Sequence, residues 1–195
     1  MVNERLKPFR DYSEHDVINL FAFGDHAVSL GTTDVVYAGS AVKVRTGWSN
    51  TNELSMIGNV GAGYNNTVSQ RWGVAADVEY TDGGADEAAL GILLYDVREY
   101  DENGEKLAFN PRKQAELQCS LTGQAVPIAT RGIFLMATGA WTNSPALVQD
   151  NDVFATGDGK LTTLGNKATN NRIGRTLGGP DADGSVLVKF DFTQG

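Results

Sequence analysis

Residues 186–192 read Val-Leu-Val-Lys-Phe-Asp-Phe, and this stretch decides the fold class. Successive side chains of a β-strand point to opposite faces, so apolar residues at every second position indicate a half-buried strand. The residues that follow this spacing are Val186, Val188, Phe190 and Phe192. The acidic and glycine residues at 181–184, directly before them, predict a hairpin turn that leads into the strand.

Similar short apolar runs recur along the chain. Alternation predicts strands at 42–44, 74–80 and 171–177. The nearly continuous apolar run at 90–97 predicts a strand covered on both faces, with a short buried helix as the alternative. The run at 125–136 contains Pro127, which indicates an edge position or a bend.

Turns rich in Gly, Asp and Asn separate these runs. Residues 101–104 predict a hairpin in which Asn103-Gly104 adopts a type I′ turn, and residues 157–159 predict another hairpin. Residues 111–121 fit either a short helix or a strand. Residues 46–67 predict a long loop, a feature that is usually functional or mobile in a compact domain.

The composition limits the classes of function. The chain has 195 residues, 41% of them apolar, which is enough for one sizeable core. A formal net charge of -8 argues against nucleic-acid and anionic-membrane partners, because both present negative phosphate. No apolar run approaches the roughly 18 residues of a membrane helix, and the first residues lack the apolar core of a signal peptide. We therefore expect the protein to be made in a cytoplasm.

Residues 1–23 differ from the remainder, because charged residues alternate there with large apolar ones. A solvated tail would not carry so many aromatic side chains, which favours an arm that lies on another surface. We divide the chain into an N-terminal arm at 1–23 and a β-rich body at 24–195. Deletion of residues 1–20 is then expected to leave the thermal transition of the body nearly unchanged. The expected partner-binding residues are Phe9, Tyr12, Val17, Ile18 and Phe21 of the arm, and Trp48 of the long loop.

These patterns together predict an all-β fold: a compact β-barrel or sandwich with an extended N-terminal arm and long loops.

Side chains suited to catalysis are few. The two histidines are His15 and His26, and a base–orienter pair of His26 with Asp25 is disfavoured because adjacent residues on an extended chain point apart. A nucleophile pair of Cys119 with a histidine has no better support. Cys119, the single cysteine, is expected as a small buried side chain in a strand. We expect no catalytic residues, no cofactor and no metal site.

Three segments resemble ligand loops, and each has a plainer structural interpretation. Residues 181–184 resemble the start of a calcium loop but lack its closing Glu, which favours a hairpin. Asp82, Asp86 and Glu87 fit an exposed acidic turn better than a cation site. The glycines of 58–63 do not follow the Gly-x-Gly-x-x-Gly spacing of a nucleotide-binding loop.

Trp48 and Trp141 lie in polar stretches, where exposed tryptophan rings can stack on sugars. Tryptophans that pack loops onto a core are commoner. The alternative function is therefore a carbohydrate-binding or adhesion β-module of a phage or bacterial surface.

Residues 173–178 read Ile-Gly-Arg-Thr-Leu-Gly, residues 181–189 read Asp-Ala-Asp-Gly-Ser-Val-Leu-Val-Lys, and residues 124–134 read Gln-Ala-Val-Pro-Ile-Ala-Thr-Arg-Gly-Ile-Phe. The first two segments are similar to the C-terminal end of tailed-bacteriophage capsid decoration (cement) proteins, where a strand leads through an acidic-glycine hairpin to a final apolar strand. The third is similar to their inner strand–Gly–strand element. The chain departs from the small decoration proteins in its length, in the loop at 46–67 and in the hairpin at 95–121.

The resemblance implies a virion structural protein, not an enzyme, that binds the outside of the major capsid shell and stabilises it. It implies two partners: the major capsid protein, and further copies of the chain itself, with a trimer favoured and a dimer possible. The expected location is the capsid surface, after synthesis in the host cytoplasm, with neither nucleic acid nor membrane as a partner.

Overall fold

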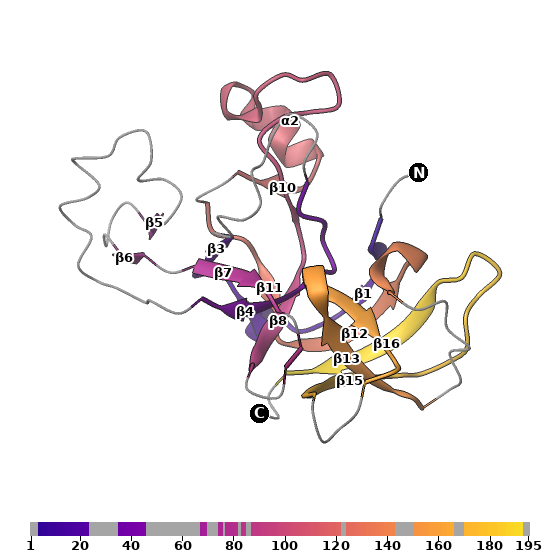
Figure 1. Ribbon diagram of the computed structural model, residues 1–195. Coiled ribbons are helices and arrows are strands. Elements are labelled where there is room, and N and C mark those ends of the chain that lie inside the picture. The colour runs from indigo at the N-terminus through magenta and orange to yellow at the C-terminus, as the bar shows by residue number, and fades with distance from the viewer. Residues whose placement is uncertain are drawn as a thin grey trace.

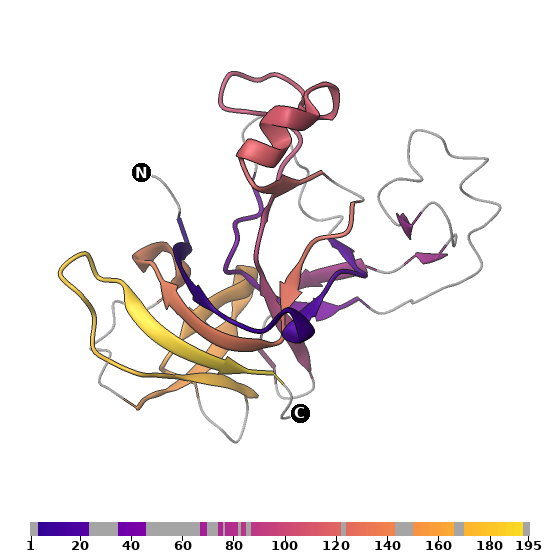
Figure 2. The same ribbon diagram turned by 180° about the vertical axis from the view of Figure 1, so that it is seen from behind.

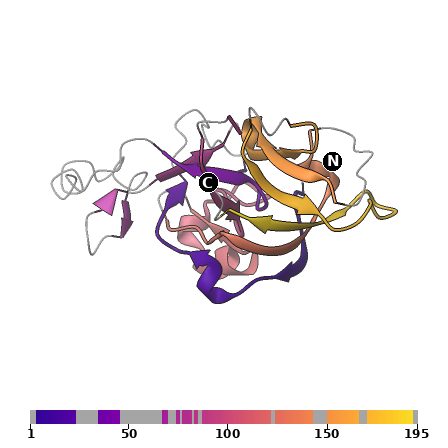
Figure 3. The ribbon, with the colours of Figure 1, turned by 90° about the horizontal axis from the view of Figure 1, so that it is seen from below.

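The structure is a computed structural model that describes residues 4–23, 35–45, 67–69, 74–75, 77–81, 83–84, 87–121, 124–142, 150–165 and 170–192. These residues are mostly β-structure, in two six-stranded sheets and two sheets of two strands. The large sheets curl, and one part forms a half-barrel (Figures 1 and 3). The prediction of a β-dominated fold is therefore confirmed.

Sheet A, as we call the first large sheet, is antiparallel throughout. It contains the final hairpin of the chain, whose turn at 181–184 is closed by the N–H of Gly184, which donates to the carbonyl of Asp181 at 2.8 Å. In spatial order its strands are β1 (Leu6–Asp11), β12 (Arg131–Met136), β16 (Val186–Asp191), β15 (Arg172–Thr176), β13 (Asp152–Thr156) and β14 (Lys160–Thr162).

Sheet B, the second large sheet, is antiparallel except for its last pair, in which β3 and β7 run parallel. Several of its strands have only two residues. In spatial order they are β2 (Val17–Ile18), β11 (Ile128–Ala129), β8 (Ala89–Leu93), β4 (Ala41–Val44), β7 (Asp77–Tyr80) and β3 (Ala22–Phe23).

The remaining elements are short. One α-helix, α2 (Pro111–Glu116), is present in the described ranges, and it lies on a projection away from both large sheets (Figures 1 and 2). The small sheets pair β9 (Asp96–Val97) with β10 (Cys119–Ser120) and β5 (Thr67–Ser69) with β6 (Val74–Ala75). Single turns of 3-10 helix occupy Glu14–Asp16, Leu107–Phe109, Thr138–Ala140 and Gly157–Gly159.

Two stretches of chain belong to both large sheets. Strand β11 of sheet B is separated from β12 of sheet A by Thr130 alone. The N-terminal segment, residues 4–23, follows the same course: β1 pairs with β12, and β2 pairs with β11. Figure 2 shows this segment, in indigo, running beside β12. The surface on which the predicted arm lies is thus the body of its own chain.

The core has two parts, one on each face of sheet B. In the first, Phe134 and Phe190 of sheet A pack with Ile92 of sheet B. In the second, Leu93 packs with Val42. Adjacent residues of β8 therefore face different clusters, which confirms a strand covered on both faces for the first part of the apolar run at 90–97. The run then bends at 94–95 and ends in the separate strand β9.

Other sequence predictions are refined by the structure. Val186, Val188 and Phe190 are fully buried, which confirms the predicted half-buried strand. The turn at 101–104 is present, but the type I′ prediction is wrong: Gly104 has φ of 80° and Asn103 is not in the left-handed region. The side chain of Asp101 accepts the N–H groups of Asn103 and Glu105, which favours a longer turn ending on a left-handed glycine. Residues 111–121 contain both alternatives, α2 followed by β10.

Candidate functional site

The N-terminal segment divides its apolar side chains between the core and solvent. Leu6 is 6% exposed and Phe21 is 8% exposed, so both are packed inside the protein. Phe9 is 55% exposed and Tyr12 is 38% exposed. Of the predicted partner-binding residues, Phe9 and Tyr12 are therefore accessible, whereas Phe21 is a core residue.

The other predicted contact residues are less accessible or lie elsewhere. Val17 and Ile18 form β2 and are half-buried, with Val17 packed against the first core cluster and Ile18 against the second. Trp48 lies outside the described residues, as does the loop at 46–67 up to Asn66. The aromatic pair Phe9 and Tyr12 is thus the accessible remainder of the predicted site.

A bulge in β1 explains why Phe9 points away from the core. The pairing advances from Leu6 to Arg10 on β1 but only from Met136 to Phe134 on β12, so β1 contains two extra residues there. Pro8 lies within this bulge and has no backbone N–H to offer another strand. An edge with a bulge and a proline resists pairing with a further strand. Contacts at this edge are therefore made by side chains, and Phe9 is the most exposed apolar one.

Arg5 anchors the start of the segment. Its guanidinium donates to Ser40 Oγ and to the backbone carbonyl of Asp158, each at 2.8 Å, and lies 5.9 Å from the ring centres of both Tyr37 and Tyr80. Burial lowers the pKa of Arg5. These contacts connect the N-terminal segment to the chain before β4, to β7 and to the turn between β13 and β14. The residues directly before the bulge that carries Phe9 are therefore held in place.

Tyr12 directly follows β1, beyond the bulge. Its ring stacks on Phe134 with 5.7 Å between centroids and an interplanar angle of 18°. Gly132, two residues before Phe134 in β12, has no side chain, and a Cβ there would lie 2.7 Å from the Phe134 ring. An aromatic side chain laid over a strand glycine is a recognised way to cover the exposed backbone. One face of Tyr12 is therefore structural, and the remainder of its ring is accessible.

The sequence reasoning missed Phe109, the most exposed aromatic side chain of the described residues, which is 86% exposed in the 3-10 turn before α2. Asn110 caps that helix by accepting the N–H of Lys113. An apolar residue before the cap normally packs on the fourth helical residue. That residue is Gln114, so the usual apolar partner of Phe109 is missing, and this mismatch is visible in the sequence.

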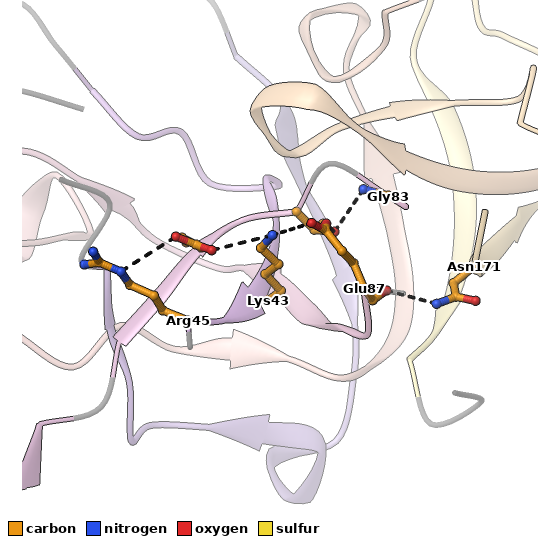
Figure 4. A network of polar contacts seen from close by, with 7 residues as sticks. Lys43, Arg45, Gly83, Glu87 and Asn171 are labelled. Atoms are coloured by element: carbon orange, nitrogen blue, oxygen red, sulfur yellow. Dashed lines mark hydrogen bonds and ion pairs between the residues drawn. The ribbon is translucent and has the colours of Figure 1, made fainter. Parts of the chain in front are cut away.

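A network of charged side chains crosses strands β4 and β7 (Figure 4). Lys43 lies between Glu87 and Glu79, with its Nζ 3.5 Å from a Glu79 carboxylate oxygen. Arg45 contacts Glu79 and Asp77 at 3.9 and 3.6 Å. The acidic groups of the network thus face cations of the same chain, an arrangement that joins strands.

The same network also reaches sheet A. Thr81 Oγ1 donates to Glu87 and accepts the N–H of Gly83. The side-chain amide of Asn171 donates to the carbonyl of Glu87 at 2.9 Å. The sequence favoured an exposed acidic turn over a cation site at Asp82, Asp86 and Glu87, and the first two of these residues lie outside the described residues. For Glu87 itself, the contacts are those of a structural ion pair.

The residues considered for catalysis lie apart. His15 is exposed on a 3-10 turn, Cys119 is buried in β10, and His26 and Asp25 lie outside the described ranges. Burial raises the pKa of the Cys119 thiol, which disfavours the reactive thiolate form. Over the described residues, no three His, Cys, Asp or Glu side chains are grouped to hold a metal ion.

Trp141 does not present its ring to a ligand. It is 7% exposed and belongs to the first core cluster, so its proposed stacking on a sugar is corrected to a packing role. Trp48, the other tryptophan of that alternative, lies outside the described residues. The described residues therefore include no exposed tryptophan ring to support the carbohydrate alternative.

Comparisons with known proteins add no relative. A scan against protein-family models and searches of curated proteins and of solved structures found no match to the chain. Among the helices in the described ranges, none has the length and apolar character needed to cross a membrane.

Proposed function

We propose that this chain is a virion structural protein that binds the outside of a tailed-bacteriophage capsid shell and stabilises it. The observation that carries the proposal is Phe9, held outward on a bulged, proline-containing edge strand of sheet A. Such an edge presents an aromatic side chain to a partner, while its bulge and proline prevent the backbone from pairing with a strand of another chain. Buried aromatic anchors supply much of the binding energy in protein interfaces.

The segments that resemble decoration proteins support the proposal through their local structure. Residues 173–176 are a strand, 181–184 a turn with two acidic residues and a left-handed glycine, and 186–189 a strand. Residues 128–129 and 131–136 are the strands β11 and β12, and Gly132 lies within β12 rather than between the two strands. The excess of acidic residues suits the outer face of a shell, away from packaged nucleic acid.

The proposed partners are the major capsid protein and further copies of this chain. A protein that binds only the assembled shell stabilises the assembled state by mass action. Symmetric shells offer symmetric sites, so we propose a trimer on the shell, with a dimer as the next choice. The proposed location is the capsid surface.

The test is co-sedimentation with empty shells assembled from the major capsid protein of the same phage. The wild-type protein is expected to bind saturably. Replacing Phe9 and Tyr12 together with Ala is expected to weaken binding about tenfold or more, because each interface aromatic contributes about 1 kcal/mol or more. Thermal melts establish that the double variant is folded.

Phe109→Ala is the matched control, because Phe109 is more exposed than Phe9 but lies on the α2 projection. It is expected to bind as the wild type does. Absence of wild-type binding would contradict the proposed function. Unchanged binding of the Phe9/Tyr12 variant would remove this edge from the mechanism.

A second readout measures stabilisation directly. Shells that lack the protein are expected to rupture at lower temperature when the salt concentration is low, since the screening length rises from about 10 Å at 0.1 M to about 30 Å at 0.01 M and packaged phosphates repel more strongly. Adding purified protein back is expected to restore resistance up to a saturating amount. Resistance that does not change on addition would contradict a stabilising role.

A further inference from the structure

The outer face of sheet A carries an apolar row across three neighbouring strands. Leu135 of β12 and Leu187 of β16 are directly opposite each other. Leu177, which follows β15, donates its N–H to the carbonyl of Leu187 at 2.8 Å. All three are half-buried, and they alternate along their strands with fully buried residues of the inner face. The outer face of sheet A thus presents leucines to its surroundings.

This row continues to the aromatic edge. Arg10 of β1 pairs with Phe134 and Asp11 pairs with Ile133, so the register brings Phe9 to the level of Leu135. The exposed ring at the bulge and the leucine row therefore adjoin each other.

A pair of cations borders the apolar row. Lys189 of β16 is directly opposite Arg175 of β15, and both are exposed. Ile133 lies opposite Lys189 on the other side. Like charges directly opposite each other on a sheet are destabilising. This pair is unusual in a chain with 24 acidic and 16 basic residues, where most cations can find an acidic neighbour.

Two other exposed cations of sheet A are paired. Arg131 contacts Asp191 at 3.4 Å, and Arg172 contacts Asp152 at 3.3 Å. Asp152 lies opposite Arg175 in the register, yet its recorded ion pair is with Arg172. Across the described ranges, neither Lys189 nor Arg175 forms an ion pair or a side-chain hydrogen bond. The fold therefore keeps two adjacent positive charges beside an apolar row.

We propose that this outer face of sheet A is the main docking surface for the shell, and that it takes an acidic protein face in which apolar side chains are flanked by carboxylates. The inference rests on the proposed function and names the chemistry of its partner. Carboxylates of the partner remove the repulsion between Lys189 and Arg175, and the leucine row and Phe9 bury its apolar side chains. Asp11 and Asp152 lie at the two ends of the cross-strand row that contains Lys189 and Arg175. Their negative charges confine the partner's carboxylates to the centre of that row.

The test reverses the charge of the pair. The variant Lys189→Glu with Arg175→Glu is compared with the wild type in co-sedimentation with the same empty shells, at several salt concentrations. The matched control, Lys106→Glu with Arg112→Glu, makes the same charge change on exposed residues of the α2 projection. We expect at least a tenfold loss of affinity and a flatter salt dependence for the first variant, and less than a twofold change for the control.

A second variant, Leu187→Ser, tests the apolar row without changing charge, and is expected to weaken binding while leaving the salt dependence as in the wild type. Thermal melts of each variant exclude unfolding as the cause. The conservative exchange Lys189→Arg with Arg175→Lys is expected to bind as the wild type does.

The outcomes separate this inference from the proposed function. If the wild type binds shells and the charge reversal binds equally well, the docking face is refuted and the function stands. If the wild type does not bind shells, both the docking face and the proposed function are contradicted. If the charge reversal instead abolishes self-association of the free protein in sedimentation velocity, with shell binding unchanged, the face takes a second copy and the assignment to the shell is overturned.

Discussion

Gly91 lies where strands β8 and β11 approach too closely for a side chain. A Cβ at this position would lie 2.3 Å from the carbonyl oxygen of Ala129 and 2.7 Å from Ile128 Cγ2. Because the nearest atom belongs to the backbone, the clash cannot be relieved by a rotamer change. The close pairing in the middle of sheet B therefore depends on the absence of a side chain at one residue.

Gly91→Ala is expected to lower the free energy of unfolding by about 1–3 kcal/mol, the usual cost of overpacking. Chemical denaturation measures it. Gly178→Ala is the matched control, because no atom lies within 4 Å of its added Cβ. Equal stability of the two variants would show that β8 can move away from β11 at little cost.

Asp101 organises the turn before the α2 projection. Its carboxylate accepts the backbone N–H groups of Asn103 and Glu105 at 2.8 and 2.7 Å and pairs with Lys113. The hydrogen bond from Lys113 is the main reason that the pKa of Asp101 lies below its ordinary value. The charged carboxylate is thus the form that the folded state favours.

A lowered folded-state pKa means that Asp101 stabilises the protein above its unfolded-state pKa of about 3.9, and that this contribution disappears as the pH falls through the folded-state value. Asp101→Asn is therefore expected to be less stable than the wild type at neutral pH, with the difference shrinking in acid. Urea denaturation across a pH series measures this. A difference that stays constant as the carboxylate titrates would contradict the assignment.

At the scale of elements, the sequence predicts those strands that have a local period and a nearby turn. Strand β16 and its hairpin have both, because alternation and a Gly184 turn lie within the same dozen residues. Strands β2, β3 and β11 have two residues each, and they exist because distant segments pair with them. No periodicity marks such strands, since two residues cannot show one.

The N-terminal segment shows that local sequence patterns are equally limited in predicting the residues of the candidate site. Its many apolar residues predict an arm that lies on a partner, whereas the described contacts of the segment are with the body of its own chain. Which of these apolar residues face inward depends on the bulge at Pro8 and on the register with β12, whose residues lie more than a hundred positions away in the sequence. The sequence therefore includes Phe9 and Tyr12 in the site but also includes Phe21, which the core encloses.

This pairing changes the expected effect of removing the segment. Deleting residues 1–20 takes Leu6 and Arg5 from the core and uncovers the edge of β12, so a lower melting temperature is now expected rather than an unchanged one. The sharper test is Leu6→Ala, expected to cost about 2–5 kcal/mol.

Phe9→Ala, three residues away and exposed, is the control and is expected to change stability by less than about 0.5 kcal/mol. Thermal and chemical denaturation of both variants measure the contrast. If Leu6→Ala is as mild as Phe9→Ala, the segment is not held by the body and the original expectation of a separate arm returns.

At the scale of the whole molecule, side-chain hydrogen bonds connect segments of the two large sheets at more than one place. Arg5 joins the connection before β4 to the turn between β13 and β14, while Asn171 joins the start of β15 to the loop before β8. The docking face proposed for sheet A lies on the side of that sheet that points away from the shared core. A partner can therefore occupy it without separating the two sheets.

The passage of one strand from sheet B into sheet A has a consequence for how the molecule comes apart. Only Thr130 separates β11 from β12. Unfolding of one sheet therefore also disrupts the strand that continues into the other sheet. The two halves are therefore expected to melt as one cooperative unit, giving a single calorimetric peak whose enthalpy equals the van't Hoff value. Two resolved peaks would contradict this. For the proposed role on a capsid shell, such all-or-none unfolding means that stabilisation persists up to one temperature and is then lost in a single step.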